Sequence, residues 1–308
     1  MIPFFEIFSS FFMYKSALKI KKNAKIAICG LLFAFVGCSF QQSAPRKLVE
    51  TSTEATTIEQ ATCVEFINLS ASNGGQKPSI SNLMSVAYHK AEKLSLRGFN
   101  LEADDFKLIG HLSQTLMYID LANCGLQKTP SALAEANGVN TLYLSDNQIA
   151  VLDESIYSLN NLTYLNLDRN VIIKLPDGIS GLKALKWLRL NNNKLSTLPT
   201  DMAELKNIKK LYLNKNEFTQ VPEVIKQMTS LEELSLGGNK ISEFPEWLCE
   251  MPNLRRIDLF GNPIKEIPDK IVDMPQLTTL VMDNCLLSNE RKLEINKKLA
   301  DKRIKFIF

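Results

Sequence analysis

The sequence predicts an α/β solenoid, in which short coils stack so that a curved parallel sheet lines the concave face and short helical or irregular segments form the convex face. Three observations support this prediction. The pattern L-x-x-L-x-L-x-x-N-x-L recurs at a fixed step of 23 residues. An asparagine returns at one place in that pattern. Finally, the leucines of one such unit are too few to form a core alone, so they must be buried against the next unit.

The fourth position of the pattern returns through consecutive units without an insertion. It falls on Ile119, Leu142, Leu165, Leu188, Leu211, Leu234, Ile257 and Leu280. An earlier unit of 25 residues contributes Leu94 and Leu96, which brings the total to nine repeats over residues 91–287. Apolar residues that alternate with variable ones predict a short half-buried strand in each unit, paired in parallel with the strands of its neighbours.

The recurring asparagine is expected to be structural. It occurs at Asn147, Asn170, Asn193, Asn216, Asn239 and Asn262. A side-chain amide both donates and accepts hydrogen bonds, so it can satisfy backbone groups that a tight turn leaves unpaired. Cys124 and Cys285 take this position in the flanking repeats, where we expect free, buried thiols.

These residues resemble the leucine-rich-repeat family over residues 91–308, and Leu185–Leu195 illustrates the match. The second half of the units, as in Leu198–Leu205, is similar to the Leu-Pro-x-x-Ile-x-x-Leu subclass. Only Asp153 interrupts its series of prolines. The resemblance implies a leucine-rich-repeat solenoid that binds another macromolecule.

The N-terminus has the layout of a signal peptide. Five lysines between Lys15 and Lys25 precede an apolar run of 12 residues that ends before Cys38. This run is shorter than the roughly 20 residues of a membrane-spanning helix. Phe35–Cys38 resembles a bacterial lipobox, in which the cysteine thiol receives a diacylglyceryl group. We expect a signal peptide at 1–37 and a lipidated tether at 38–62, starting from Met1 or Met13; the alternative is a secretory signal without lipidation.

The location expected for the mature protein is the bacterial outer membrane, held there by its lipid anchor. Ser39 follows the cysteine, whereas an aspartate there retains many lipoproteins in the inner membrane. The sequence leaves open whether the protein faces the periplasm or the cell surface.

Both ends of the stack need covers, because a solenoid otherwise exposes an apolar face. We expect an N-terminal cap at 63–90. For the C-terminal cap at 288–308, Ser288 should begin a helix with Leu293, Ile295 and Leu299 as its apolar residues, and a strand-like segment should follow from Ile304.

Charge and motif content disfavour nucleic-acid binding and catalysis. The chain of 308 residues has a formal net charge of +3, but residues 1–37 hold five lysines and one acidic residue, so the remainder has a net charge of −1. A near-neutral body does not match a phosphate backbone. The sequence contains no phosphate-binding Gly-rich loop with its lysine, no G-x-S-x-G and no zinc-type cysteine pairs, so we expect no enzyme activity and no cofactor.

One enzymatic alternative is hydrolysis of envelope polysaccharide, which needs two carboxyl groups about 5 to 10 Å apart. Asp146 and Asp168 occupy neighbouring repeats, but both are expected to be solvated, which disfavours this interpretation.

The candidate binding residues are the variable side chains between the strand leucines, which should point outward on the concave face. They are Tyr118, Tyr143, Tyr164, Trp187, Arg189, Lys210, Tyr212, Arg256 and Asp258, with Phe260 at the edge. Tyr, Trp and Arg are enriched at interface hot spots, so Tyr164, Trp187, Arg189 and Tyr212 are expected at the centre. The alternative is that these aromatic residues serve only cross-strand packing.

The function expected from these features is a lipid-anchored interaction scaffold of the bacterial envelope, whose partner is a protein or a cell-wall glycan. A surface-exposed adhesin that contacts host or neighbouring cells is the alternative.

Overall fold

A computed structural model describes residues 63–65 and 92–308 of the chain. The expected signal peptide, the lipidation site Cys38 and the tether at 38–62 lie outside the described residues, as does most of the expected N-terminal cap.

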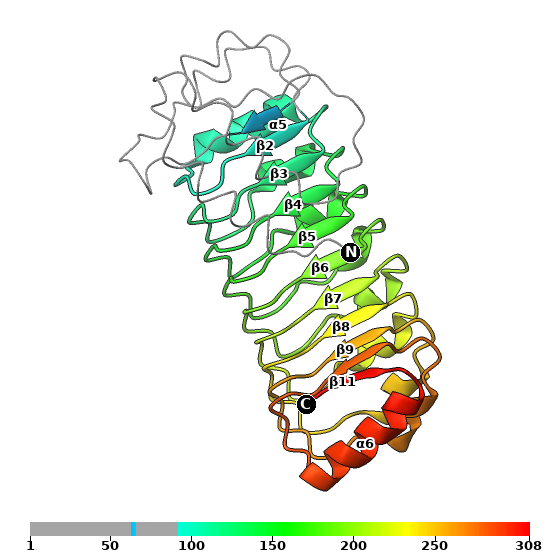
Figure 1. Cartoon of the computed structure of the whole chain (residues 1–308). Coiled ribbons are helices and arrows are strands. Elements are labelled where there is room, and N and C mark those ends of the chain that lie inside the picture. The colour runs from blue at the N-terminus through cyan, green and yellow to red at the C-terminus, as the bar shows by residue number, and fades with distance from the viewer. Residues whose placement is uncertain (1–62, 66–91) are drawn as a thin grey trace, which may run out of the picture. The chain divides into compact units, whose positions relative to one another are not determined.

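The described residues form one parallel sheet in which the strands follow each other in chain order (Figure 1). The predicted solenoid fold is therefore confirmed. The sheet has eleven strands: β1 (Cys63–Glu65), β2 (Lys93–Ser95), β3 (Tyr118–Asp120), β4 (Thr141–Tyr143), β5 (Tyr164–Asn166), β6 (Trp187–Arg189), β7 (Lys210–Tyr212), β8 (Glu233–Ser235), β9 (Arg256–Asp258), β10 (Thr279–Val281) and β11 (Lys305–Ile307).

Short helical segments connect successive strands on the other side of each coil. Most are single 3-10 turns, whereas the 25-residue first unit contains a short α-helix, α5. These segments are η4 (Ala103–Phe106), α5 (Lys107–Leu112), η5 (Ser131–Glu135), η6 (Glu154–Ser158), η7 (Ile179–Gly181), η8 (Thr200–Glu204), η9 (Glu223–Gln227), η10 (Glu246–Glu250) and η11 (Asp269–Asp273), and α6 (Asn289–Asp301) precedes β11.

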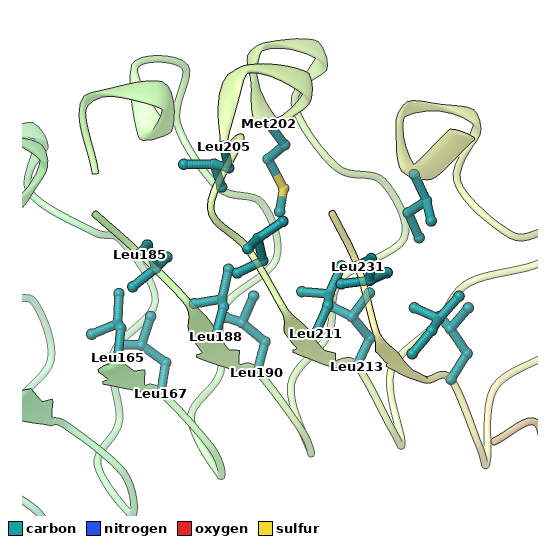
Figure 2. Packing of buried hydrophobic residues seen from close by; sticks show 14 of the residues in the cluster. Leu165, Leu167, Leu185, Leu188, Leu190, Met202, Leu205, Leu211, Leu213 and Leu231 are labelled. Atoms are coloured by element: carbon teal, nitrogen blue, oxygen red, sulfur yellow. The ribbon is translucent and has the colours of Figure 1, made fainter. Parts of the chain in front are cut away.

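The strand register places equivalent residues of successive repeats beside each other. Leu188, for example, pairs with Leu165 on one side and Leu211 on the other. These central residues are fully buried, and Figure 2 shows their side chains packed between the strands and the 3-10 segments. The first and third residues of each strand are left to face outward.

The asparagine ladder has the structural role expected from the sequence. In one rung, the side-chain N–H groups of Asn193 donate to the carbonyls of Leu167 (3.0 Å) and Leu190 (3.1 Å). Its Oδ1 accepts from the backbone N–H of Ile172 at 3.1 Å. Each asparagine therefore bonds its own coil to the preceding one.

Most of the 3-10 turns begin in extended backbone, which proline favours, whereas η7 begins after Gly178 in a left-handed conformation. Pro199, Pro222 and Pro245 precede η8, η9 and η10. Asp153 replaces the proline before η6, and its side chain accepts from the N–H of Ser155 at 3.0 Å. The interruption of the proline series is thus compensated by a side-chain cap.

The C-terminal end contains the expected helix, α6, which lies at the β11 end of the sheet (Figure 1). The hydroxyl of Ser288 caps it by accepting from the N–H of Arg291 at 3.1 Å. Ile295 and Leu299 are buried against the last repeat. Leu293 was expected to pack with them, but it is 66% exposed. Ile295 and Leu299 are four residues apart and share one face of the helix, whereas Leu293 lies on another face.

Candidate interaction surface

The outward residues of β3 to β9 form a continuous surface that we call the strand face. It is composed of Tyr118, Asp120, Thr141, Tyr143, Tyr164, Asn166, Trp187, Arg189, Lys210, Tyr212, Glu233, Ser235, Arg256 and Asp258. Asp120, Asn166 and Ser235 lie on this face but are buried by their neighbours. The candidate binding residues selected from the sequence all occupy it, except Phe260, which lies two residues beyond β9.

Four aromatic side chains of the strand face contact each other in series, and we call them the aromatic ladder. The ring centroids are 5.5 Å apart for Tyr118 and Tyr143, 5.0 Å for Tyr143 and Tyr164, and 5.8 Å for Tyr164 and Trp187. Cross-strand aromatic packing is therefore real and contributes to the sheet. It also leaves the rings fixed in place, and Trp187 at the end of the series is 44% exposed.

Two cations contact aromatic rings at the C-terminal end of the aromatic ladder. The Lys210 ammonium lies 5.2 Å from the centre of the Trp187 ring system, and the Arg189 guanidinium lies 5.1 Å from that of Tyr212. Such contacts stabilise the orientation of both groups by about 0.5–1 kcal/mol at exposed sites. The aromatic rings and the charged side chains thus form one connected surface.

Arg189 is held by a buried carboxylate. Its guanidinium lies 2.7 Å from Oδ2 of Asp168, which is only 1% exposed. The other carboxylate oxygen of Asp168 accepts from the N–H of Asn191 at 2.7 Å. The expectation that Asp168 is solvated is therefore wrong, because this carboxylate serves as a buried tie between repeats. The Arg189 guanidinium therefore stabilises the fold through Asp168, in addition to lying on the strand face.

Asp146 is partly exposed and paired with Arg169, which belongs to the next repeat. The hydrogen bonds from Arg169 hold the pKa of the Asp146 carboxyl below its usual range. A glycosidase needs one carboxyl group that keeps its proton near neutral pH. Asp146 is held in the opposite protonation state, so the geometry does not favour this pair as a hydrolytic site.

Glu233 is a strand-face residue that the sequence-based selection missed. Its carboxylate lies 2.7 Å from the Lys210 ammonium and accepts from the Tyr212 hydroxyl at 2.8 Å. Burial acts to raise the pKa of Glu233, but the hydrogen bonds from Lys210 and Tyr212 outweigh it, and the pKa is lowered. The signal was present in the sequence, because Glu233 occupies the same pattern position as Trp187 and Lys210.

The C-terminal part of the strand face contains the remaining predicted residues. The Arg256 guanidinium lies 3.5 Å from the Asp258 carboxylate. Phe260 is half-buried and covers Gly237 so closely that an added Cβ there would lie 2.0 Å from a ring carbon. Phe260 therefore packs on the preceding turn, and only part of its ring is exposed on the outward surface.

Two grooves of the described chain lie outside the strand face. A groove of about 1110 Å³ is lined by residues such as Phe106, Leu126 and Val151, and one of about 590 Å³ by residues such as Phe244 and Ile267. Neither groove is lined by a strand residue. Among the residues that the structure describes, no group of acidic, cysteine or histidine side chains is suited to hold a metal ion, and no helix has the length and apolarity to cross a bilayer.

The thiols of the repeats are buried, as expected. Cys124, Cys249 and Cys285 are free, and Cys124 donates to the carbonyl of Leu96 at 3.0 Å. Burial raises the pKa of Cys124 and of Cys249 to about 12.

Iodoacetamide at pH 8 should therefore modify Cys124 and Cys249 at least about a hundredfold more slowly in the native protein than in the unfolded protein, because the thiolate is the reactive form. Mass spectrometry of peptides measures each site separately. Equal rates in the native and unfolded protein would show that these thiols are not in the core.

The fold and the strand face together define a class of protein, a repeat solenoid that presents a continuous outward sheet surface. Two family models match the chain, a leucine-rich repeat region at residues 154–257 and a leucine rich repeat at residues 114–172. Residues 114–257 thus match the leucine-rich-repeat family, in agreement with the solenoid fold of the described residues. Members of this class are typically protein-binding modules without enzymatic activity. A comparison with curated proteins found no match.

Solved structures show the same fold. A leucine-rich-repeat protein of Leptospira interrogans is 28% identical, with a TM-score of 0.67, over 82% of this chain and 62% of that chain, so this chain spans less than two thirds of it. An internalin from Listeria monocytogenes is 20% identical over 82% of this chain and 75% of that chain, with a TM-score of 0.61.

A plant structure shows the same fold. The ectodomain of the Arabidopsis thaliana receptor kinase GASSHO1/SCHENGEN3, in complex with CASPARIAN STRIP INTEGRITY FACTOR 2, is 21% identical over 82% of this chain and 33% of that chain, with a TM-score of 0.60.

Proposed function

We propose that this leucine-rich-repeat protein is a lipid-anchored scaffold of the bacterial envelope that binds a protein partner through its strand face. The observation that carries the proposal is the aromatic ladder with Trp187 at its exposed end. A rigid aromatic side chain loses little conformational entropy on binding, and Trp is the residue type most often found at the energetic centre of protein interfaces.

Two features favour a protein over a glycan as the partner. Sugar rings stack on open aromatic faces, whereas the rings of Tyr143 and Tyr164 are turned toward neighbouring rings 5.0 to 5.8 Å away. The surface also combines aromatic side chains with Arg189 and Arg256, and these residue types are enriched at protein interfaces.

The location is proposed from the N-terminal sequence alone. Phe35–Cys38 provides the lipidation signal, and Ser39 directs the protein to the outer membrane. The two or three acyl chains of such an anchor hold a protein stably at a bilayer, where a single chain would be marginal.

The binding proposal is tested with Trp187→Ala. Because Trp187 is exposed, its removal should change the free energy of unfolding by less than about 1 kcal/mol while lowering partner capture from solubilised envelope at least about tenfold. Ile173→Ala is the matched control, since Ile173 is 61% exposed and lies outside the strand face. Undiminished capture by Trp187→Ala, or equal loss in both variants, would refute binding at this surface.

Protease added to intact cells determines the side of the membrane. Protection of the full-length protein supports a periplasmic scaffold, and cleavage supports the adhesin alternative.

A further inference from the structure

The strand face changes in character at Trp187. On β3 to β5 its charges are balanced locally, since Arg97 pairs with Asp120 at 2.9 Å and Arg169 pairs with Asp146. From β6 to β9 aromatic residues become rare and cations become frequent. We call this second half, together with its flanking turns, the cationic sector.

Cations outnumber carboxylates in the cationic sector. Its cations are Lys186, Arg189, Lys209, Lys210, Lys215, Arg255 and Arg256, and the carboxylates within reach of them are Asp168, Glu232, Glu233 and Asp258. Each of these carboxylates is already held by one cation of the sector, namely Arg189, Lys209, Lys210 and Arg256 respectively.

Three cations remain in surplus. Lys186, Arg255 and Lys215 are exposed. None of them has a carboxylate oxygen of the described residues within 4.0 Å of its side-chain nitrogens. Lys186 and Arg255 precede β6 and β9 at the same pattern position, on one edge of the strand face, whereas Lys215 follows β7 on the opposite edge. The surplus charge therefore brackets the surface beside Trp187.

Water solvates these exposed cations, and anionic groups of another molecule can replace that water. Lys186 and Arg255 are three strand steps apart, which corresponds to about 14 Å at the usual strand spacing. An extended polypeptide covers that distance in about four residues. Carboxylates of one extended segment can therefore contact both cations while a neighbouring apolar side chain lies on Trp187.

A polypeptide fits better than a nucleic acid. Glu232, Glu233 and Asp258 lie at β8 and β9, so a continuous phosphate backbone that runs from Lys186 to Arg255 would meet these carboxylates. Separate carboxylates on a peptide can be spaced to avoid them. Bases also require open aromatic faces to stack on, and the tyrosine rings of the ladder are turned toward each other.

We propose that the strand face binds an extended acidic polypeptide segment that bears an aromatic or apolar side chain, placed against Trp187, with its carboxylates at Lys186, Arg255 and Lys215. This inference rests on the proposed function and specifies the chemistry of the partner.

The experiment uses the full-length protein in detergent micelles with Trp247→Phe, which leaves Trp187 as its single tryptophan. A glutamate–tyrosine copolymer should change Trp187 fluorescence saturably. Polyglutamate should bind more weakly, because it lacks the ring, and a lysine–tyrosine copolymer should cause no saturable change. Equal binding of the lysine–tyrosine copolymer, or tighter binding of a single-stranded oligonucleotide, would overturn the proposal.

Charge variants test the assigned cations. Lys186→Glu with Arg255→Glu should weaken binding of the glutamate–tyrosine copolymer about tenfold, whereas Lys174→Glu with Lys226→Glu, which reverses two exposed lysines outside the strand face, should change it less than about twofold. If the two double variants weaken binding equally, the effect comes from the net charge of the protein and not from Lys186 and Arg255, which would contradict the proposal. If the copolymer fails to bind while partner capture still depends on Trp187, the acidic-peptide inference is wrong and the proposed function stands.

Discussion

Phe218→Ala is expected to lower the free energy of unfolding by about 3–5 kcal/mol. Phe218 is fully buried and is the largest such side chain in the stack. The equivalent residues in the neighbouring coils are Leu195 and Ile241, which are also fully buried. Removing the ring leaves a cavity that the coils on both sides cannot fill, because each is fixed by its own ladder of backbone hydrogen bonds.

Urea unfolding followed by circular dichroism measures this loss. Phe218→Leu is the matched control, since leucine occupies this position in other coils, and it should cost less than about 1.5 kcal/mol. An equal cost for the two variants, or a cost below about 1 kcal/mol for alanine, would show that the stacked coils are not tightly packed at this position.

Asn193→Ala is expected to cost about 1–3 kcal/mol, because it leaves the Ile172 N–H without its partner and removes one of the two asparagine donors to each of the Leu167 and Leu190 carbonyls. The damage should be directional. Two of these three groups belong to the preceding coil, so the contact between the coils of β5 and β6 should weaken most.

Hydrogen exchange resolves this effect along the chain. Protection should fall most in residues 165–195, and the adjacent exposed residue provides the control. Asn192 has a backbone φ of 56°, a left-handed conformation that glycine adopts easily, so Asn192→Gly should leave protection unchanged or slightly raised. Protection lost equally in both variants would contradict a structural role specific to the buried asparagine.

The repeat period and the leucine pattern within it predicted the fold. Residues such as Leu165, Leu188 and Leu211 return every 23 positions, and units of this length bury their leucines when equivalent residues stack. The same period located the outward positions of the strand face. Register follows from it directly, because a slip of one residue would expose every leucine.

Contacts between variable residues could not be predicted in this way. The burial of Asp168 depends on the guanidinium of Arg189 one repeat later, and the conformation of Glu233 depends on Lys210 and Tyr212. These pairings involve side chains that the repeat pattern leaves free, so their geometry is set by neighbours and not by period. The short helix α5 in the first unit was likewise not signalled by the leucine spacing.

The distribution of contacts also ranks the candidate binding residues. Arg189 is partly committed to Asp168, and Tyr118, Tyr143 and Tyr164 pack on other rings. Trp187 contacts Tyr164 on one side and Lys210 on the other. It is also the most exposed of the four aromatic-ladder residues. It is therefore the residue whose removal should affect binding most and folding least.

Site-specific photo-crosslinking in the producing cells addresses whether the strand face is where the partner binds. A benzophenone amino acid at Tyr164, on the strand face, should yield a crosslinked protein partner, whereas the same amino acid at Ser158, an exposed residue of η6 on the other side of the coil, should not. Crosslinks from Ser158 with none from Tyr164 would place the partner on the opposite side and contradict binding through the strand face.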